Sequence, residues 1–204
     1  MSEMEWTENI IIADADYADR VAFDLTVNFE RMIGRRIPKA DMARWVECIA
    51  LDGGMRPDES QSNPERLQQT QVVLIHDDGR QLMENFTPGH YADELHGKAF
   101  KGPLGEFTFT CSSPKGMTTK EGLLLDTLAA MAQSEQVKRI MVVPADRHAD
   151  AVGRFLRRQR PGQCAVTLFA MQPLPGGHFA QELLGYSLMA ALGVKGSELK
   201  PDDM

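Results

Sequence analysis

Short apolar runs closed by polar residues divide the chain at regular intervals. The first holds three consecutive isoleucines and runs into Asp14, Ala15 and Asp16, a pattern typical of a buried parallel strand ending at the carboxyl edge of a sheet. A later run alternates phenylalanine with threonine, which predicts a strand that is half exposed or near the sheet's edge. The predicted strands are Asn9–Ala13, Gln71–Ile75, Glu106–Cys111, Ile140–Val143 and Ala165–Ala170.

Between these strands, apolar residues recur at spacings of three and four, which predicts amphipathic helices. We expect Asp16 to cap the first helix and Gly34 to end it, and the capping-box pair Thr118 and Glu121 to begin a later one. The predicted helices cover residues 17–33, about 39–51, about 118–134, a segment ending near 159, and a last segment that carries Leu183, Leu184, Leu188 and Leu192.

The alternation of strand and helix is the signature of parallel crossovers, with helices on both faces of one sheet. The sequence therefore predicts the α/β class, as a three-layer α/β/α sandwich with a mostly parallel, Rossmann-like sheet. At 204 residues we expect a single domain. Residues 80–104 are poor in apolar positions and rich in glycine and proline, which predicts either short helical turns or an irregular excursion, and residues 195–204 form a polar tail.

Composition narrows the functional classes. No apolar run approaches the roughly 20 residues that a membrane span needs, and the first nine residues are acidic and polar, so no membrane partner is expected. The three cysteines, Cys48, Cys111 and Cys164, are odd in number and far apart, which favours reduced thiols and a cytoplasmic protein. A net charge of -7 argues against a surface that wraps DNA by neutralising phosphates.

Aspartates stand at the ends of several predicted strands. They are Asp14 and Asp16 after the first, Asp77 and Asp78 after the second, and Asp146 after the fourth. In parallel sheets the carboxyl ends of the strands meet at one edge, where ligands gather. Carboxylates brought together there repel one another unless a cation such as Mg²⁺ or Mn²⁺ neutralises them. The alternative is that each aspartate only caps the helix that follows its strand.

The order of these motifs resembles the NYN branch of the PIN-like nuclease superfamily. Residues Asn9–Asp16 are similar to the first element of that family, the segment from Lys120 to Asp126 falls where its middle motif stands, and IMVVPADRHAD at Ile140–Asp150 resembles its last. The chain departs from the family pattern at Pro144 and Ala145, which replace a Ser-Gly turn, and at His148, which stands in place of a second aspartate.

The resemblance implies a metal-dependent ribonuclease with RNA as its partner. It implies catalytic roles for Asp14, Asp16 and Asp146, and a Mg²⁺ or Mn²⁺ ion held by Asp14 (or Asp16), Asp126 and Asp146. The alternative for Asp126, which stands within a leucine-rich helix, is an exposed residue on the polar face of that helix. Lys120 and the arginines Arg154, Arg157 and Arg158 would then contact the RNA backbone, whereas the alternative for the arginines is a solvated helix end. The degenerate last motif leaves a second function open, a non-catalytic binding or regulatory protein on the same fold.

The sequence does not decide whether two histidines share a cleft or whether the protein forms oligomers. His76 and His148 both follow predicted strands and would face the same cleft if the sheet brings them together. A homo-oligomer is conceivable through the last helix or through an edge strand near Phe107. The aromatic residues form no stacking platform that the sequence reveals.

Overall fold

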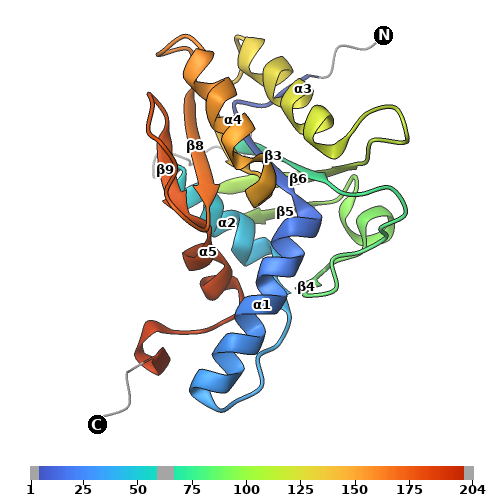
Figure 1. Cartoon of the computed structure of the whole chain (residues 1–204), viewed down its shortest axis with the longest axis vertical. Helices are drawn as coiled ribbons and strands as arrows, with labels where there is room; N and C mark the ends of the chain where they lie inside the picture. The colour runs from blue at the N-terminus through green and yellow to red at the C-terminus, as the bar shows by residue number, and fades with distance from the viewer. Residues whose placement is uncertain (1–4, 59–66, 200–204) are drawn as a thin grey trace.

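The computed structural model describes residues 5–58 and 67–199 and contains a seven-stranded sheet. The strand order is β5-β6-β3-β1-β7-β8-β9, and every pair is parallel except β5 and β6. This confirms the predicted α/β class with a mostly parallel sheet (Figure 1). The strands are β1 (Asn9–Asp14), β3 (Gln69–Ile75), β5 (Ala99–Gly102), β6 (Gly105–Ser112), β7 (Arg139–Val143), β8 (Ala165–Ala170) and β9 (Ala180–Leu183).

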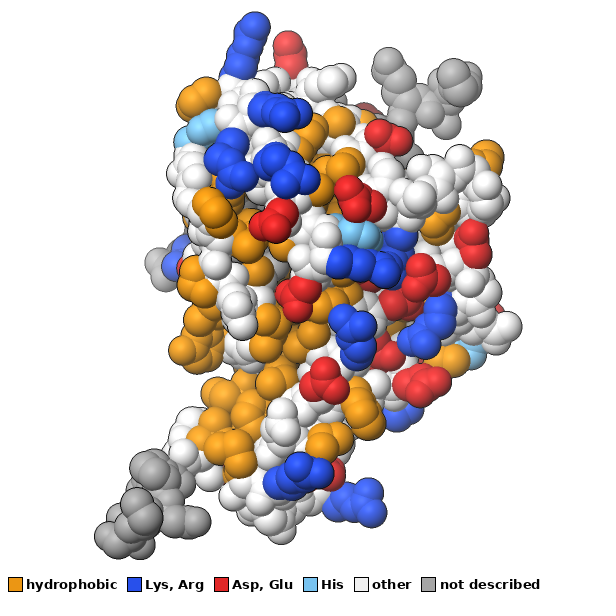
Figure 2. All heavy atoms as spheres, viewed as in Figure 1, with side chains coloured by type: hydrophobic (Ala, Val, Ile, Leu, Met, Phe, Trp, Pro, Cys, Tyr) orange, Lys and Arg blue, Asp and Glu red, His pale blue; other side chains and the backbone are white. Residues whose placement is uncertain are grey.

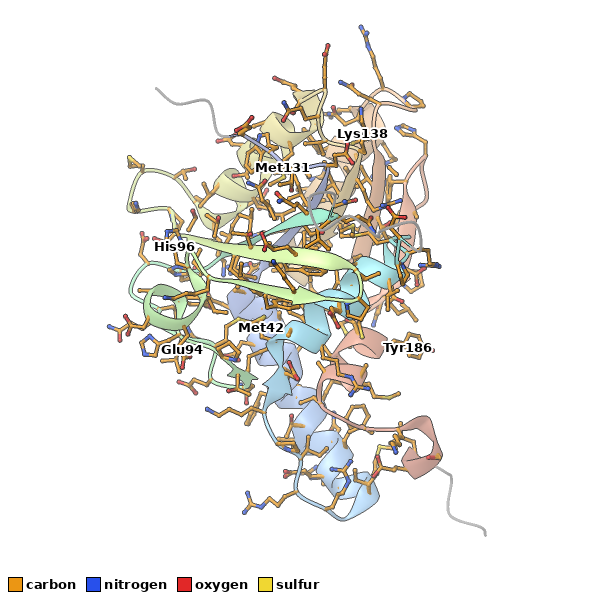
Figure 3. The ribbon with its side chains drawn as sticks, turned by 180° about the vertical axis from the view of Figure 1, so that it is seen from behind. Met42, Glu94, His96, Met131, Lys138 and Tyr186 are labelled. Atoms are coloured by element: carbon orange, nitrogen blue, oxygen red, sulfur yellow. The ribbon has the colours of Figure 1, made fainter. Side chains whose placement is uncertain are left out.

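Helices cover both faces of the sheet. Figure 1 shows α3 and α4 on one face and α1, α2 and α5 on the other. The helices are α1 (Ala15–Ile33), α2 (Met42–Asp52), α3 (Lys120–Gln133), α4 (Asp146–Arg158) and α5 (Leu184–Ala191). Figure 3 shows the same layering from behind, with Met42 and Met131 on opposite sides of the sheet.

The buried strand β1 divides the hydrophobic core in two, because successive side chains of a strand point to opposite faces. Ile11 and Ala13 pack with α1, α2 and α5, whereas Ile10 and Ile12 pack with α3 and α4. All four side chains are fully buried. The run of isoleucines that predicted a buried strand is therefore explained by helices on both of its faces.

The position of β1 also determines where polar side chains gather. Its last residue, Asp14, is in register with Ile75 at the end of β3, and Ala13 is in register with Val143 at the end of β7. After β1, the strands β3 and β6 are added on one side of it, and β7 and β8 are then added on the other side. This reversal of direction is the place at which α/β sheets form a crevice beyond the carboxyl ends of their strands.

Several details differ from the sequence predictions. Asp14, not Asp16, caps α1, since its carboxylate accepts a hydrogen bond from the backbone N–H of Tyr17. The α3 cap is Thr119 rather than Thr118. By contrast, the prediction for β6 is confirmed: it lies next to the edge strand β5, and its residues alternate between buried and partly buried.

The predicted excursion contains ordered structure. It holds the short strand β4 (Phe86–Thr87), which pairs with β2 (Ala40–Asp41), a π-helical turn η2 (Tyr91–Leu95), and the edge strand β5. The carboxylate of Asp19, only 3% exposed, accepts hydrogen bonds from the backbone N–H groups of Glu84 and Asn85. The N-terminal part of α1 therefore holds this segment beside the carboxyl edge of the sheet.

The polar tail begins with a 3-10 turn, η3 (Gly196–Leu199), and its last five residues, 200–204, lie outside the described residues. In the part of the chain that the structure describes, no helix combines the length and apolar character needed to cross a membrane.

Candidate functional site

Carboxylates from two neighbouring strands meet at the carboxyl edge of the sheet. Asp14 ends β1 and is 2% exposed, Asp16 lies in the first turn of α1, and Asp77 follows β3. The backbone N–H of Asp77 donates a hydrogen bond to the carboxylate of Asp16, which connects the two strand ends directly. The convergence expected from the sequence is present for these three residues.

The ammonium group of Lys120 lies between the three carboxylates. Its Nζ atom is 3.1 Å from an oxygen of Asp14, 3.1 Å from one of Asp77 and 3.4 Å from one of Asp16. Lys120 is the first residue of α3 and is only 9% exposed. A buried ammonium is stable only when it is paired and hydrogen-bonded, and these three acids meet that requirement.

The electrostatic environment of this cluster follows from those contacts. Burial alone lowers the pKa of Lys120, but Asp14, Asp77 and Asp16 outweigh it and hold the pKa above its ordinary value. Burial raises the pKa of Asp77, and the hydrogen bond and charge of Lys120 reverse this and leave it below the ordinary range. Lysine and aspartate therefore stabilise each other's charged forms.

Asp146 joins the same cleft through a different partner. The hydroxyl of Tyr17 donates a hydrogen bond of 2.6 Å to its carboxylate. Burial and the neighbouring carboxylate of Asp146 raise the pKa of Tyr17, so the phenol stays protonated. The guanidinium of Arg20 lies 5.6 Å from the centre of the Tyr17 ring, and Arg147 is exposed at the start of α4.

Together these groups line an open cleft of about 460 Å³. We call it the carboxylate cleft, and its lining residues are Asp14, Asp16, Tyr17, Arg20, Asp77, Lys120, Ala145, Asp146 and Arg147. Figure 2 shows acidic and basic side chains interleaved on this face of the molecule. The cleft therefore carries charges of both signs and is not a purely acidic pocket.

The carboxylates do not fit a resident metal ion in this arrangement. A divalent cation bridging Asp14, Asp16 and Asp77 would have to take the place of the Lys120 ammonium, which already neutralises them. Among residues 5–58 and 67–199, no group of three or more His, Cys, Asp and Glu side chains is arranged to hold a metal. The Mg²⁺ or Mn²⁺ ion stays a prediction.

Asp126, predicted as a metal ligand, does not line the carboxylate cleft. It is exposed on α3, six residues after the buried Lys120. At 3.6 residues per turn this spacing rotates Asp126 roughly 120° around the helix from Lys120. The structure brings Asp14, Asp16 and Asp146 to one cleft and leaves Asp126 outside it.

Of the residues predicted to contact nucleic acid, the arginines lie on the surface of α4, whereas Lys120 is buried in the carboxylate cleft. Lys120 is engaged by carboxylates, so its charge is not available to a phosphate group. Arg154 and Arg158 are exposed on α4, and Arg157 donates a hydrogen bond to the carbonyl of Pro175. Blue side chains gather over α4 in Figure 2.

The two strand-end histidines do not share a cleft. His148 is buried on α4, where its Nε2 atom lies 3.4 Å from a carboxylate oxygen of Glu121. His76 instead lines a separate cleft beside η2. Burial lowers the pKa of His148, although Glu121 partly opposes this effect.

Sequence reasoning missed several residues of the site. Tyr17 was assigned only to a helix, and Arg20 and Arg147 were not singled out. A signal for Arg147 existed, because it follows Asp146 directly at the end of a predicted strand. The pairing of Tyr17 with Asp146 spans 129 residues, so no local pattern indicates it.

Comparison with known proteins yields one finding. A family model described as a family of unknown function, DUF6621, matches residues 3–199. Neither the curated proteins nor the solved structures give a match. Because the matching model spans nearly the whole sequence, the chain belongs to the DUF6621 family.

Proposed function

We propose that this protein is a non-catalytic binding or regulatory protein whose carboxylate cleft works without a resident metal ion. The observation that carries the proposal is the position of Lys120, within 3.4 Å of three carboxylates. In a metal-dependent enzyme such carboxylates must be open to the cation. Here a buried side chain of the protein supplies the positive charge.

The partner that we propose is single-stranded RNA. Arg147, Arg154 and Arg158 follow one another at intervals of seven and four residues along α4, so they share one helix face. Arg147 lines the carboxylate cleft together with Arg20, and all four arginines are exposed. A row of cations that leads into a cleft suits a phosphate backbone, and the acidic side chains within the cleft would restrict how deeply it enters.

Fluorescence anisotropy with a labelled single-stranded RNA of about 12 nucleotides tests this partner. We expect the double variant Arg147→Ala plus Arg154→Ala to weaken binding by about tenfold at low salt, through the loss of two phosphate contacts. The matched control is Arg31→Ala plus Arg36→Ala, which removes the same charge near the far end of α1. Equal weakening in both variants would mean that only net charge matters and would overturn the assignment to α4.

Thermal unfolding tests the absence of a resident metal. We expect the melting temperature of the native protein to be insensitive to millimolar Mg²⁺ or Mn²⁺, because Lys120 already pairs the carboxylates. In Lys120→Met the melting temperature should fall and then rise on addition of either ion. A rise in the native protein comparable to that in the variant would contradict the proposal.

A metal-dependent ribonuclease is the second candidate. Two observations favour it: Asp14, Asp16, Asp77 and Asp146 line one cleft, and Oδ2 of Asp14 is buried with no hydrogen-bond partner among the described residues. RNA cleavage in the presence of Mn²⁺ tests it, with Asp14→Asn plus Asp146→Asn as the comparison. Cleavage by the native chain that is abolished in the double variant supports the nuclease, whereas equal activity in both excludes this mechanism.

A cytoplasmic location is part of the proposal. It is supported by Cys48, Cys111 and Cys164, which are all free thiols. Burial raises the pKa of each of these thiols, so they are poorly reactive.

A further inference from the structure

A second cleft lies beside the first at the carboxyl edge of the sheet. Its volume is about 530 Å³, and it shares no lining residue with the carboxylate cleft. We call it the imidazole cleft, and its lining residues are His76, Arg80, Gln81, His90, Tyr91, Ala92, Asp93, His96, Cys111 and Lys115. They come from the ends of β3 and β6, the turn after β6, and the segment around η2. Figure 3 labels Glu94 within η2 and His96 directly after it.

Two rings of this cleft are stacked face to face. The centroids of His76 and Tyr91 are 4.1 Å apart and their planes differ by 8°. Tyr91 is 3% exposed, and its hydroxyl donates a hydrogen bond of 3.0 Å to Asp16. His76 is half-buried at the cleft. A fixed tyrosine therefore supports an accessible imidazole, the arrangement on which a further planar ring stacks favourably.

Hydrogen bonds determine which ring nitrogens carry protons in the neutral histidines. Nδ1 of His76 lies 2.9 Å from the carbonyl oxygen of Asp77, so this nitrogen donates and Nε2 is left as an acceptor. Nδ1 of His96 accepts from the backbone N–H of Cys111 at 3.0 Å, so the proton of His96 is on Nε2. In their neutral forms His76 and His96 thus contribute one acceptor nitrogen and one donor nitrogen to the residues of the cleft, a combination complementary to the polar edge of a nucleobase.

A cation stands at the rim in an uncommon backbone conformation. Lys115 has a φ of 53°, the left-handed region, and is the one non-glycine residue with positive φ in the described part of the chain. The carboxylate of Asp78 holds this turn by accepting hydrogen bonds from the backbone N–H groups of Lys115 and Gly116, at 2.8 and 2.9 Å. Arg80 is paired with Asp16 and Asp19, so Lys115 is the cation better placed to meet an anionic ligand.

We propose that the imidazole cleft is a nucleotide-binding subsite, in which a heterocyclic base stacks on His76 and a phosphate group lies beside Lys115. This inference goes beyond the proposed function, because the residues that would contact the ligand, His76 and Lys115, lie outside the carboxylate cleft and outside α4. The ligand is a free nucleotide or one nucleotide of a single-stranded RNA, which present the same chemistry to the cleft.

NMR titration of the full chain tests the subsite, with the imidazole C–H signals as the readout and AMP, UMP, adenosine and inorganic phosphate as separate probes. We expect AMP and UMP to shift the signals of His76 and His96. His76→Ala should weaken AMP binding by about tenfold through lost stacking, whereas His76→Phe keeps a ring and should stay within about threefold of the native protein. Lys115→Gly, which suits the left-handed backbone, should reduce the preference for AMP over adenosine.

The matched control is His178→Ala, an exposed histidine outside the imidazole cleft, which should leave AMP binding unchanged. A labelled RNA of eight nucleotides distinguishes the two possible ligands, a single-stranded RNA and a free nucleotide. RNA is supported if it binds more tightly than AMP and if this binding weakens in His76→Ala. A free nucleotide is supported if the RNA binds no more tightly than AMP. The proposal is overturned if phosphate alone shifts the signals as AMP does, or if His76→Ala binds AMP like the native chain. Neither result depends on the α4 arginines, so failure here is separable from failure of the proposed function.

Discussion

Nζ of Lys120 and Oδ1 of Asp14 lie 3.1 Å apart, in side chains that are 8% and 2% exposed. Removing the ammonium leaves a buried carboxylate without its cation, which in other proteins costs about 3 to 5 kcal/mol. We expect Lys120→Met to lower the free energy of unfolding by about 3 kcal/mol, measured by urea denaturation at pH 7.

The control for this variant is Lys101→Met. The Lys101 side chain is 67% exposed and lies 3.9 Å from Glu106, so its loss should change the free energy of unfolding by less than about 1 kcal/mol. If Lys120→Met is no more destabilising than Lys101→Met, the carboxylates do not need the lysine. The pairing with Lys120 also makes stability depend on pH. The pKa of Asp77 is lower in the folded than in the unfolded protein, where it is about 3.9. The contribution of Asp77 to the free energy of unfolding is therefore complete above about pH 3.9 and is lost as the pH falls through the lower folded value.

The hydrogen bond from Tyr17 to Asp146 connects α1 with the start of α4. Its length of 2.6 Å and its charged acceptor place it among the stronger hydrogen bonds of proteins. Tyr17→Phe keeps the ring and removes only the hydroxyl, so we expect a loss of roughly 1.5 to 3 kcal/mol in the free energy of unfolding. Tyr186→Phe, at a tyrosine that is 66% exposed, serves as the control and should be neutral. A loss below about 0.5 kcal/mol for Tyr17→Phe would show that this bond is not stabilising.

His148 makes stability depend on pH below about 6.5, the ordinary pKa of a histidine. Burial lowers its pKa in the folded state, so the unfolded chain, with a value near 6.5, binds the proton more readily. The contribution is complete above pH 6.5 and is lost as the pH falls toward the lower folded value. We expect His148→Gln, which cannot titrate, to flatten the decline in melting temperature over this range. An unchanged slope in the variant would assign the decline to other groups.

Asp19 holds the segment that carries the imidazole cleft. Its carboxylate accepts hydrogen bonds from two backbone N–H groups and lies 3.3 Å from Nη2 of Arg80. In Asp19→Ala these partly buried donors lose their acceptor, which costs about 1 to 3 kcal/mol. Hydrogen exchange of the amides of Glu84 and Asn85 should accelerate, whereas Asp24→Ala, at an exposed position of the same helix, should leave both amides protected. Unchanged exchange in Asp19→Ala would mean that the segment is held by its other contacts.

Five strands of the seven-stranded sheet and the α-helices followed from the sequence, because burial on both faces requires continuous apolar runs, as in Ile10, Ile11 and Ile12. The convergence of Asp14 and Asp16 with Asp77 followed from the same logic, since parallel strands end together. The strand β9 escaped because three of its four residues are exposed and it carries no apolar run. The pattern of apolar residues indicates a strand only where at least one of its faces is buried, as in β6.

The role of Lys120 lay beyond sequence reasoning for a different reason. It reaches Asp16 across 104 residues, and its position depends on where α3 starts relative to the end of β1. The stacked pair of His76 and Tyr91 was missed in the same way, because η2 brings the tyrosine to the end of β3 through a segment with little periodicity. Ion pairs and stacked rings between residues that are far apart in the sequence leave no pattern in either local segment.

The two borders of the sheet are each formed by a four-residue strand, β5 at one end and β9 at the other. Lys101 on β5 and Glu182 on β9 are both exposed. A strand of another molecule that added to either edge by backbone hydrogen bonds would therefore lie beside a charged side chain. Phe107, on the neighbouring strand β6, is fully buried and is paired with Phe100 of the edge strand β5. Short, charged edge strands of this kind protect proteins from edge-to-edge aggregation. Lengthening β5, or replacing Lys101 and Glu182 with valine, would therefore be expected to promote aggregation of this protein.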